Sequence, residues 1–422
     1  MSFASSYLQK HSFFRPFIPD EPGENTSIIV VIPCFNEPAV LDSLVSLYNA
    51  HKPSLPVEVI VAVNSPEGTG RMNREQNKKT IVQVQKWSSI HSGQNFKVHV
   101  IDVPPFPAKH AGAGFARKVG MDEAVHRFNM LNNDRGIIVS FDADSVCDNN
   151  YFTELERCFS RPETKGCTVY FEHPLPGENN SCSVNPAIIL YEIYLRYFIQ
   201  AMRLAGFPWS FHTIGSCFAV KSLIYARQGG MNRKKAGEDF YFLHKLFSLG
   251  NFTELNTTRV IPSSRISDRV AFGTGATIKK IAGSSQGQLL TYPPESFEEL
   301  EAVFTSVPDF YRSTDQDIAR LTERFPGFMR DYLFKTGFAG AVREANKHSA
   351  GIRTFRKRFF IWFNALRLLQ YLNFAHNNGR PNLPVAEAAK MLLERSGITP
   401  ESNNKNLLLQ YRMLQRKVVW KC

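Results

Sequence analysis

The sequence lacks the features that most directly mark secreted or membrane-spanning proteins. Its seven cysteines are scattered and form no Cys-x-x-Cys pair, which is typical of a protein in a reducing compartment without structural disulfides. No run approaches the ~20 apolar residues of a membrane span, because the best candidate, 187–204, is interrupted by Glu192, Arg196 and Arg203. The N-terminal residues lack the apolar core of a signal peptide. These absences predict a cytoplasmic protein.

Acidic residues are in the minority. The 422 residues include 50 Lys and Arg against 38 Asp and Glu, which gives a net charge of +12. A basic balance favours acidic partners such as nucleic acid, an anionic lipid surface or a phosphorylated ligand. Helix-turn-helix, zinc-finger and RNP-type signatures are missing from the sequence, so we expect no nucleic-acid partner.

What is present is the composition of an ordinary globular protein. Hydrophobic residues make up 43% of the chain and charged residues 21%. At roughly 150 residues per domain, the length predicts two or three domains. Aromatic residues reach 12%, with 34 phenylalanines. Aromatic faces serve sugar sites and membrane surfaces as well as cores, and we assign most of these residues to the core.

The first half of the chain alternates apolar runs with helix-compatible stretches. Continuous apolar runs are typical of strands that are buried on both faces of a sheet. Strands are predicted at 27–35, 57–64, 97–103, 136–141, 167–175 and 215–222. Helices are predicted at 38–50, between the second strand and about residue 87, at 112–131 and at 186–204. This alternation implies right-handed crossovers and a mostly parallel, Rossmann-like sheet flanked by helices. Such a sheet binds ligands beyond the carboxyl ends of its strands.

The pattern changes after about residue 274, where helical periodicity takes over. We therefore expect an N-terminal extension at 1–25, an α/β domain at 26–274 and a mainly helical region at 275–422. Within that region, basic residues lead into an aromatic stretch at 355–374 that has two interpretations. One is a helix that lies on an anionic membrane. The other is a core helix whose cations face solvent.

Polar residues follow the predicted strands where ligands are expected. The first strand runs into Asn36 and Glu37, the second ends at Asn64, and the fourth ends at Asp142 and Asp144. Each of these alone has a structural explanation as a turn former or helix N-cap. In an extended chain Asp142 and Asp144 point the same way, and two such carboxylates repel unless a cation or proton lies between them. Mg²⁺ or Mn²⁺ would meet this need, since it binds one or two carboxylates together with water and phosphate oxygens.

Four segments together resemble the successive signatures of family 2 glycosyltransferases with the GT-A fold. They are 30–47 (VVIPCFNEPAVLDSLVSL), 112–125 (GAGFARKVGMDEAV), 137–145 (IIVSFDADS) and 229–246 (GGMNRKKAGEDFYFLHKL). They occur in this order, within a region that spans more than half of the chain. The resemblance implies a GT-A-type α/β domain that transfers a sugar from a nucleotide-sugar.

The resemblance also implies roles for residues on the donor side. The segment that contacts the donor's nucleoside is matched by Pro33, Phe35, Asn36 and Glu37. Asn64 stands where many relatives carry an Asp that contacts the base. Arg117 matches an arginine near the donor, and Lys118 stands where relatives usually have Asn. Asp142 and Asp144 match the DxD motif that binds the metal, with Asp144 as the more direct ligand.

A second acidic pair, Glu238 and Asp239, opens a predicted amphipathic helix. Acids in a first helical turn also stabilise the helix through its macrodipole, which is the structural alternative. The resemblance implies that a carboxylate of this pair is the general base that takes the proton from the acceptor hydroxyl. We assign Asp239 to that role and Glu238 to contact with the acceptor; a single base facing the anomeric carbon implies inversion. The cations at 233–235 either reach the diphosphate or form an exposed basic loop.

Several weaker candidates stay open. Three histidines are candidates for a third metal ligand, namely His173, His212 and His244. The alternative is that they are ordinary core or surface residues. The segment 263–275, which holds Arg265, Asp268 and Arg269, is a candidate for a loop that closes over the donor phosphates. Gly114 and Gly120 serve either the donor site or close packing of a helix on the sheet.

The sequence therefore predicts a metal-dependent, inverting glycosyltransferase of the hexosyltransferase type, with Mn²⁺ or Mg²⁺ as cofactor. A nucleotide-sugar, by default a UDP-sugar, is the expected donor. A glycan or lipid-linked hydroxyl is the expected acceptor, in polysaccharide or glycoconjugate synthesis. The protein is expected in the cytoplasm, and peripheral association with the inner face of the membrane is an open alternative. Two other functions are alternatives. Retention of both acidic pairs speaks against a non-catalytic nucleotide-sugar-binding scaffold, and the absence of a Gly-rich pyrophosphorylase loop speaks against a sugar nucleotidyltransferase.

Overall fold

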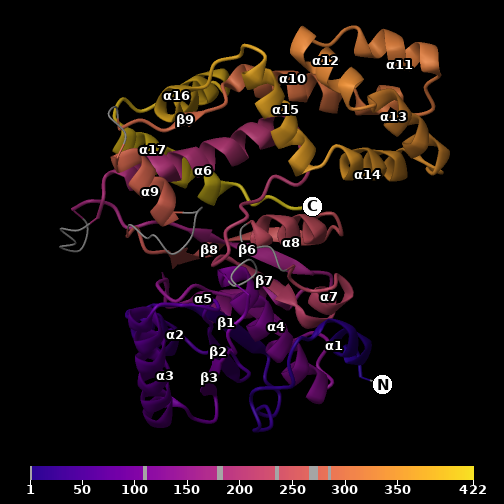
Figure 1. The fold of residues 1–422 in the computed structure, drawn as a ribbon. Coiled ribbons are helices and arrows are strands. Elements are labelled where there is room, and N and C mark those ends of the chain that lie inside the picture. The colour runs from indigo at the N-terminus through magenta and orange to yellow at the C-terminus, as the bar shows by residue number, and fades with distance from the viewer. Residues whose placement is uncertain (1, 108–111, 178–183, 233–236, 266–273, 284–286) are drawn as a thin grey trace. The chain divides into compact units, whose positions relative to one another are not determined.

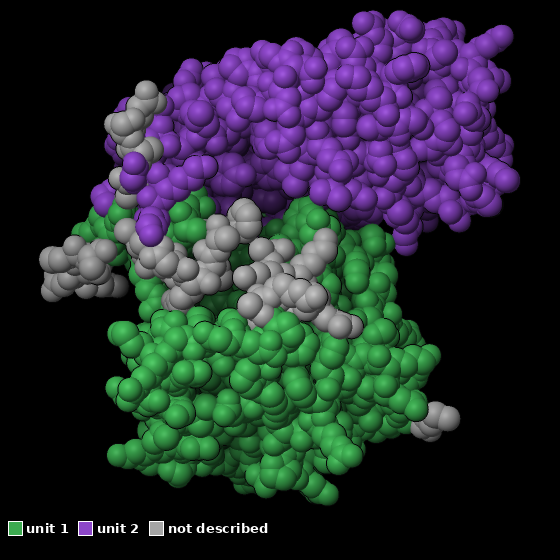
Figure 2. Space-filling view, in the orientation of Figure 1, with its two compact units in different colours: residues 1–185, 213–277, 415–422 green, residues 186–212, 278–414 purple. Residues whose placement is uncertain are grey.

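The chain forms two compact units, which Figure 2 shows in different colours. A computed structural model describes residues 2–107, 112–177, 184–232, 237–265, 274–283 and 287–422. Unit 1 comprises Met1–Asn185, Thr213–Thr277 and Gln415–Cys422, and unit 2 comprises Pro186–His212 and Ile278–Leu414. Unit 2 thus includes a segment from the first half of the chain in addition to most of the region after residue 274.

Unit 1 is built around an eight-stranded sheet with the order β3-β2-β1-β4-β7-β6-β8-β5 (Figure 1). The strands are β1 Ile28–Cys34, β2 Val57–Val63, β3 Phe96–Asp102, β4 Ile137–Ser140, β5 Val146–Cys147, β6 Gly166–Phe171, β7 Phe218–Lys221 and β8 Phe252–Ile261. The first four strands run parallel, as do β6 and β8. Strand β7 is antiparallel to both of its neighbours, and β5 is antiparallel to β8. The expected α/β class with a mostly parallel sheet is confirmed.

Helices cover this sheet and pack closely against it. Those of unit 1 are α1 Ser5–His11, α2 Val40–Asn49, α3 Arg71–His91, α4 Ala113–Met130, α5 Tyr151–Phe159, α7 Ser222–Arg227 and α8 Glu238–Phe247. Helix α4 packs against β1 and β2, both of which are buried along their whole length. A Cβ atom on Gly120 would lie 2.5 Å from Cγ1 of Val31, so glycine at this position permits the close approach of α4 to β1.

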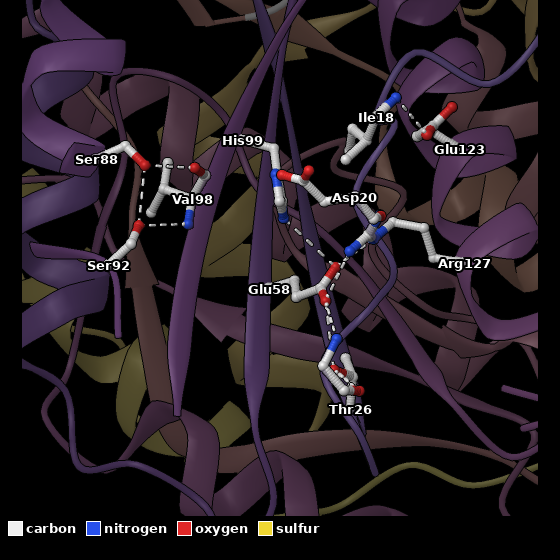
Figure 3. A network of polar contacts seen from close by, with 11 residues as sticks. Ile18, Asp20, Thr26, Glu58, Ser88, Ser92, Val98, His99, Glu123 and Arg127 are labelled. Atoms are coloured by element: carbon white, nitrogen blue, oxygen red, sulfur yellow. Dashed lines mark hydrogen bonds and ion pairs between the residues drawn. The ribbon is translucent and has the colours of Figure 1, made fainter. Parts of the chain in front are cut away.

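A buried polar cluster ties the N-terminal segment of the chain to α4 and β2 (Figure 3). The carboxylate of Glu58 accepts hydrogen bonds from Nε and Nη2 of Arg127 and from the backbone N–H of Gly23. Nη1 of Arg127 donates to the carbonyl of Asp20 at 2.9 Å. Burial by itself raises the pKa of Glu58, but the hydrogen bonds and charge of Arg127 outweigh it and the pKa is lowered. The cluster explains how a charged side chain is accommodated within a strand that is otherwise apolar.

Unit 2 is almost entirely helical in its described residues. Its helices are α6 Ala187–Leu204, α10 Pro294–Thr305, the 3₁₀-helix Val307–Phe310, α11 Asp315–Thr322, α12 Gly327–Lys335, α13 Phe338–Lys347, α14 Ile352–Trp362, α15 Ala365–Asn377 and α16 Val385–Arg395. Two short strands, β9 Leu290–Thr291 and β10 Leu383–Pro384, pair with each other. Helices α9 Thr274–Ala282 and α17 Asn404–Lys417 each contain residues of both units. The mainly helical C-terminal region is as expected.

Aromatic side chains form much of the core of unit 2. The ring of Phe304 lies 5.2 Å from that of Phe360 and 5.1 Å from that of Phe363, between ring centroids. Phe355 and Phe359 on α14 are buried as well. The aromatic side of the stretch 355–374 therefore belongs to the core.

Helix α6 is the segment that comes nearest to a membrane span in the sequence, and its buried Glu192 is paired inside unit 2. Glu192 is fully buried and lies 2.7 Å from Nη2 of Arg196 and 2.7 Å from Nε of Arg412, which belongs to α17. These charges are satisfied in the core and mark the helix as a buried one. Among the described residues, no helix combines the length and apolar character needed to cross a bilayer.

Candidate active site

The residues expected to bind and react gather where the parallel strands of unit 1 end. Asn36 and Glu37 follow β1, Asn64 follows β2, and Asp142 and Asp144 follow β4. Ion pairs connect two of these strand ends to the starts of α4 and α8 and to the segment after β8. The sheet thus brings together side chains that lie far apart in the sequence.

Arg117, on the first turns of α4, links the two acidic pairs. Its side chain is 3% exposed; Nη1 lies 2.7 Å from Oε1 of Glu238 and Nη2 lies 2.9 Å from Oδ1 of Asp142. Burial by itself lowers the pKa of this guanidinium, but the charges of Asp142 and Glu238 outweigh it and the pKa is raised. The arginine that was expected near the donor is therefore a buried cation with a carboxylate on each of its terminal nitrogens.

Two glycines leave the space that Arg117 and Glu238 occupy. A Cβ on Gly215 would lie 2.6 Å from Nη2 of Arg117. A Cβ on Gly114 would lie 2.5 Å from Cγ of Glu238. Side chains at either position would displace the bridge, which gives Gly114 a role in the site itself.

The two acids at the start of α8 have different surroundings. Glu238 is 7% exposed and held by Arg117. Asp239 is partly exposed, and its Oδ1 accepts a hydrogen bond of 2.7 Å from the backbone N–H of Phe240. Burial, followed by the charge of Glu238, raises the pKa of Asp239 from 3.8 to about 6, with Arg117 acting in the opposite direction. Among the described residues Asp239 forms no ion pair, so a carboxylate with a raised pKa is left to accept a proton.

Asp144 and Glu37 share a second arginine, Arg265. Nη2 of Arg265 lies 3.1 Å from Oδ2 of Asp144, and Nη1 donates to Oε1 of Glu37 at 2.9 Å. Glu37 is 1% exposed, so its contact with the guanidinium is largely shielded from water. Arg265 comes from the segment 263–275 that was expected to approach the donor phosphates; Asp268 and Arg269 lie outside the described residues.

Asp142 and Asp144 suit a divalent cation that draws its other ligands from elsewhere. No group of three or more His, Cys, Asp or Glu side chains within the described ranges is arranged to hold a metal ion. The side chains of Asp142 and Asp144 are 37% and 27% exposed, so water and a ligand can reach them. Two carboxylates completed by water and diphosphate oxygens form a common Mg²⁺ site in proteins, and on this criterion the residues fit the expected metal.

Two of the three candidate histidines lie in the core of unit 1, and the third belongs to unit 2. The ring of His173 packs against Phe171 at 5.7 Å between centroids, and His212 is a buried residue of unit 2. His244 is buried on α8, where burial lowers its pKa to about 3. Its ring packs against Phe240 at 4.5 Å between centroids. The described contacts of His173 and His244 place them in the core of unit 1.

Asn77, which the sequence did not single out, orders the strand ends that were expected to contact the nucleoside. It lies buried on α3; its Oδ1 accepts from the backbone N–H of Asn36 at 2.8 Å, and its Nδ2 donates to the carbonyl of Asn64 at 3.0 Å. Asn36 has a φ of 49°, a left-handed conformation that asparagine tolerates better than most residues. Thr80, one turn further along α3, donates to the carbonyl of Glu37 at 3.2 Å. The buried side of α3 at Asn77, Thr80, Val84 and Trp87 follows helical spacing, which could have revealed this role.

The remaining donor-side residues differ in exposure. Pro33 lies within β1 opposite Ala62 of β2 and is buried, whereas Phe35 is partly exposed. Asn64 is 4% exposed, and its Nδ2 donates to the carbonyl of Gly112 at 3.3 Å. Its side chain therefore supports the start of α4.

Two further expectations concern basic residues near the site. Lys118 is buried, and its Nζ lies 2.8 Å from Oδ2 of Asp122 and 3.3 Å from the hydroxyl of Tyr7. The side chain of Lys118 thus lies on the inner side of α4, between that helix and α1. The cations at 233–235 lie outside the described residues.

Comparison with known proteins finds structural neighbours but no match by sequence. No protein-family model and no curated protein matches this chain. S. aureus TarS 1–349 in complex with UDP-GlcNAc matches 80% of this chain and 92% of its own at 12% identity, with a TM-score of 0.41. GalNAc-T7 with UDP, GalNAc and Mn²⁺ matches 85% of this chain and 59% of its own at 11% identity, with a TM-score of 0.36. Both TM-scores are below 0.5, so the function is argued from the site itself.

Proposed function

We propose that this protein is a metal-dependent, inverting glycosyltransferase that moves a sugar from a nucleotide-sugar to a hydroxyl acceptor. The main support is that Arg117 links the two acidic pairs. It binds Asp142 at the end of β4 and Glu238 at the start of α8, next to Asp239. A transferase of this kind needs one group of carboxylates for the donor and another for the acceptor, at a fixed separation. The motifs that resemble family 2 glycosyltransferases supply the same residues.

On the donor side, Asp142 and Asp144 would hold Mn²⁺ or Mg²⁺. When bound, such an ion neutralises the negative charge that develops on the leaving diphosphate. Arg265 lies beside Asp144 and is a second cation within reach of a phosphate group there. We assign the nucleoside to the segment that follows β1, where Phe35 and Asn36 are partly exposed. A UDP-sugar is the donor we expect.

On the acceptor side, Asp239 is the proposed general base. The acceptor oxygen attacks C1 of the sugar as its proton passes to Asp239, and the bond between C1 and the diphosphate oxygen breaks. A base with a pKa of about 6 is ionised at neutral pH yet basic enough to accept this proton. Glu238, held by Arg117, contacts the acceptor or fixes the position of α8. A glycan or lipid-linked hydroxyl in polysaccharide or glycoconjugate synthesis is the acceptor that we propose.

The first experiment identifies the donor by thermal shift. Nucleotide-sugars are screened with and without Mn²⁺, because a ligand that binds only the folded state raises its melting temperature. We expect one UDP-sugar to give the largest shift with Mn²⁺ and to lose the metal-dependent part in Asp144→Ala. Asp102→Asn is the matched control, since Asp102 is an exposed carboxylate at the end of β3 in the same sheet. A screen in which no nucleotide-sugar raises the melting temperature would contradict the proposal.

The second experiment separates the proposed transferase from the two other functions that the sequence left open. The selected donor is incubated with Mn²⁺ and a panel of acceptors, and release of the nucleoside diphosphate is measured. Binding without any release of diphosphate would favour a nucleotide-sugar-binding scaffold. Formation of pyrophosphate from a nucleoside triphosphate and a sugar phosphate would instead favour a nucleotidyltransferase.

A further inference from the structure

Helix α14 of unit 2 presents a row of cations on its exposed side. Its inner side is apolar, with Phe355, Phe359 and Phe360 buried in the core. The charged residues on its exposed side are Arg353, Arg356, Lys357 and Arg358. The helix contains no acidic residue, so its three turns carry a net positive charge throughout.

Several arginines of unit 2 have a carboxylate partner, and within the described residues the cations of α14 do not. Arg320, Arg343 and Arg380 each form an ion pair with an Asp or Glu of the same unit. In the part of the chain that the structure describes, none of the four cations of α14 forms such a pair. Between Glu344 and Glu387 the sequence has seven Lys and Arg and no Asp or Glu. The charge on this surface is therefore available to an external anion.

Apolar side chains are exposed among the same cations. Arg353, Lys357 and Ile361 are spaced four residues apart and so form one line along the helix. Ile361 is 51% exposed and Ile352, at the start of the helix, is 42% exposed. A polyanion such as nucleic acid is bound by cations and gains little from exposed aliphatic groups. A lipid surface uses both, since cations attract anionic headgroups and aliphatic groups enter the boundary with the acyl chains.

We infer that the exposed side of α14 is a docking surface for a membrane that contains anionic lipids. The aromatic side of the helix stays in the core of unit 2, so binding occurs by adsorption of the cations with the two isoleucines at the interface. Each Lys or Arg near an anionic bilayer contributes about fivefold to the partition coefficient. At that rate the four cations of α14 together raise the partition coefficient by about 600-fold. This inference concerns binding alone and does not depend on the proposed transferase activity.

The test is co-sedimentation of the full chain with vesicles. Vesicles of phosphatidylcholine are compared with vesicles of phosphatidylcholine and phosphatidylglycerol, at low and high salt. We expect binding only to the mixed vesicles and weaker binding at high salt, because salt screens exposed charges. Arg353→Gln/Lys357→Gln should lower the partition coefficient by about 25-fold, at about fivefold for each cation removed.

A matched double variant measures the contribution of net charge alone. Lys79→Gln/Lys86→Gln on α3 also removes two exposed cations, but from unit 1. It should bind the mixed vesicles nearly as the wild type does. Equal losses in the two double variants would contradict the inference, since binding would then follow net charge. So would unchanged binding in the α14 variant.

A third variant separates a lipid surface from other polyanions. Ile361→Ser should weaken binding to the mixed vesicles several-fold and leave binding to a duplex DNA unchanged. Since Ile361 is half exposed, the substitution should not disturb folding, which circular dichroism can verify. Binding to DNA that is tighter than binding to vesicles, and that is lost in the α14 double variant, would assign the surface to nucleic acid and overturn the inference.

Discussion

Replacing Arg117 with Met removes the buried cation that lies between Glu238 and Asp142, and we expect a large loss of stability. The side chain of Glu238 is 9% exposed, so it would lose its counter-ion without gaining water. That of Asp142 is 37% exposed and can be hydrated instead. Removing one partner from a buried ion pair typically costs 3–5 kcal/mol. Because only one of the two carboxylates is deeply buried, we expect about 3 kcal/mol for Arg117→Met.

A double variant tests whether that cost comes from Glu238. Glu238→Gln removes the charge that Arg117→Met would strand, so the double variant should be more stable than the sum of the single effects predicts. We expect a coupling free energy of about 2 kcal/mol. The assay is urea-induced unfolding followed by circular dichroism and fluorescence together, since coincident transitions verify that one cooperative step is measured.

The control for this experiment is the same substitution in an exposed ion pair. Arg157 is 63% exposed where it pairs with Glu154, so Arg157→Met should cost less than about 1 kcal/mol. A cost of Arg117→Met no greater than that of Arg157→Met would show that Arg117 is not a buried counter-ion. Effects of Arg117→Met and Glu238→Gln that add to within about 0.5 kcal/mol would show that the cost does not come from Glu238.

Three further predictions concern the same site. A carboxyl whose pKa is raised on folding, as that of Asp239 is to about 6, weakens the folded state once pH rises through that value. Asp239→Asn should therefore raise the free energy of unfolding by about 1 kcal/mol at pH 8, and this gain should vanish below pH ~4. Urea-induced unfolding measured at a series of pH values tests this. Gly114→Ala should cost about 1–3 kcal/mol in thermal or urea unfolding because its Cβ would meet Glu238, whereas Gly70→Ala, with no atom within 4 Å, should cost far less. Asp144→Ala should abolish binding of Mn²⁺ to the protein–donor complex, measured by electron paramagnetic resonance, and metal binding at wild-type strength would exclude Asp144 as a ligand.

Much of the sheet could be predicted because its signals are local. Four consecutive apolar runs correspond to β1 to β4, and strands buried on both faces leave such runs in the sequence. The polar residues that end these strands could be placed at one edge because parallel strands share the direction of their carboxyl ends. Strand β7 was predicted as a strand, but its antiparallel position between β4 and β6 depends on pairing that no local pattern encodes.

The partners within the candidate site could not be predicted because they are distant in sequence. Arg117 and Glu238 are 121 residues apart, and Arg265 and Glu37 are 228 apart. Nothing in the local pattern around Arg117 indicates that both of its terminal nitrogens bind carboxylates. Lys118 differs in that its partner, Asp122, lies only four residues along α4, but the local pattern does not show that this pair is buried. Such pairings follow from how α4 and α8 pack, which sequence periodicity does not specify.

If Asp239 takes the proton from the acceptor, turnover must depend on its carboxylate, which Asp239→Asn removes. The donor selected by thermal shift is used at saturation with Mn²⁺, and release of the nucleoside diphosphate is followed for the wild type, Asp239→Asn and the control Asp102→Asn. We predict that Asp239→Asn keeps the donor-induced thermal shift of the wild type and loses at least about 100-fold in kcat, the usual contribution of a general base. We predict that Asp102→Asn retains wild-type turnover. Turnover of Asp239→Asn at the rate of the wild type would exclude Asp239 as the general base.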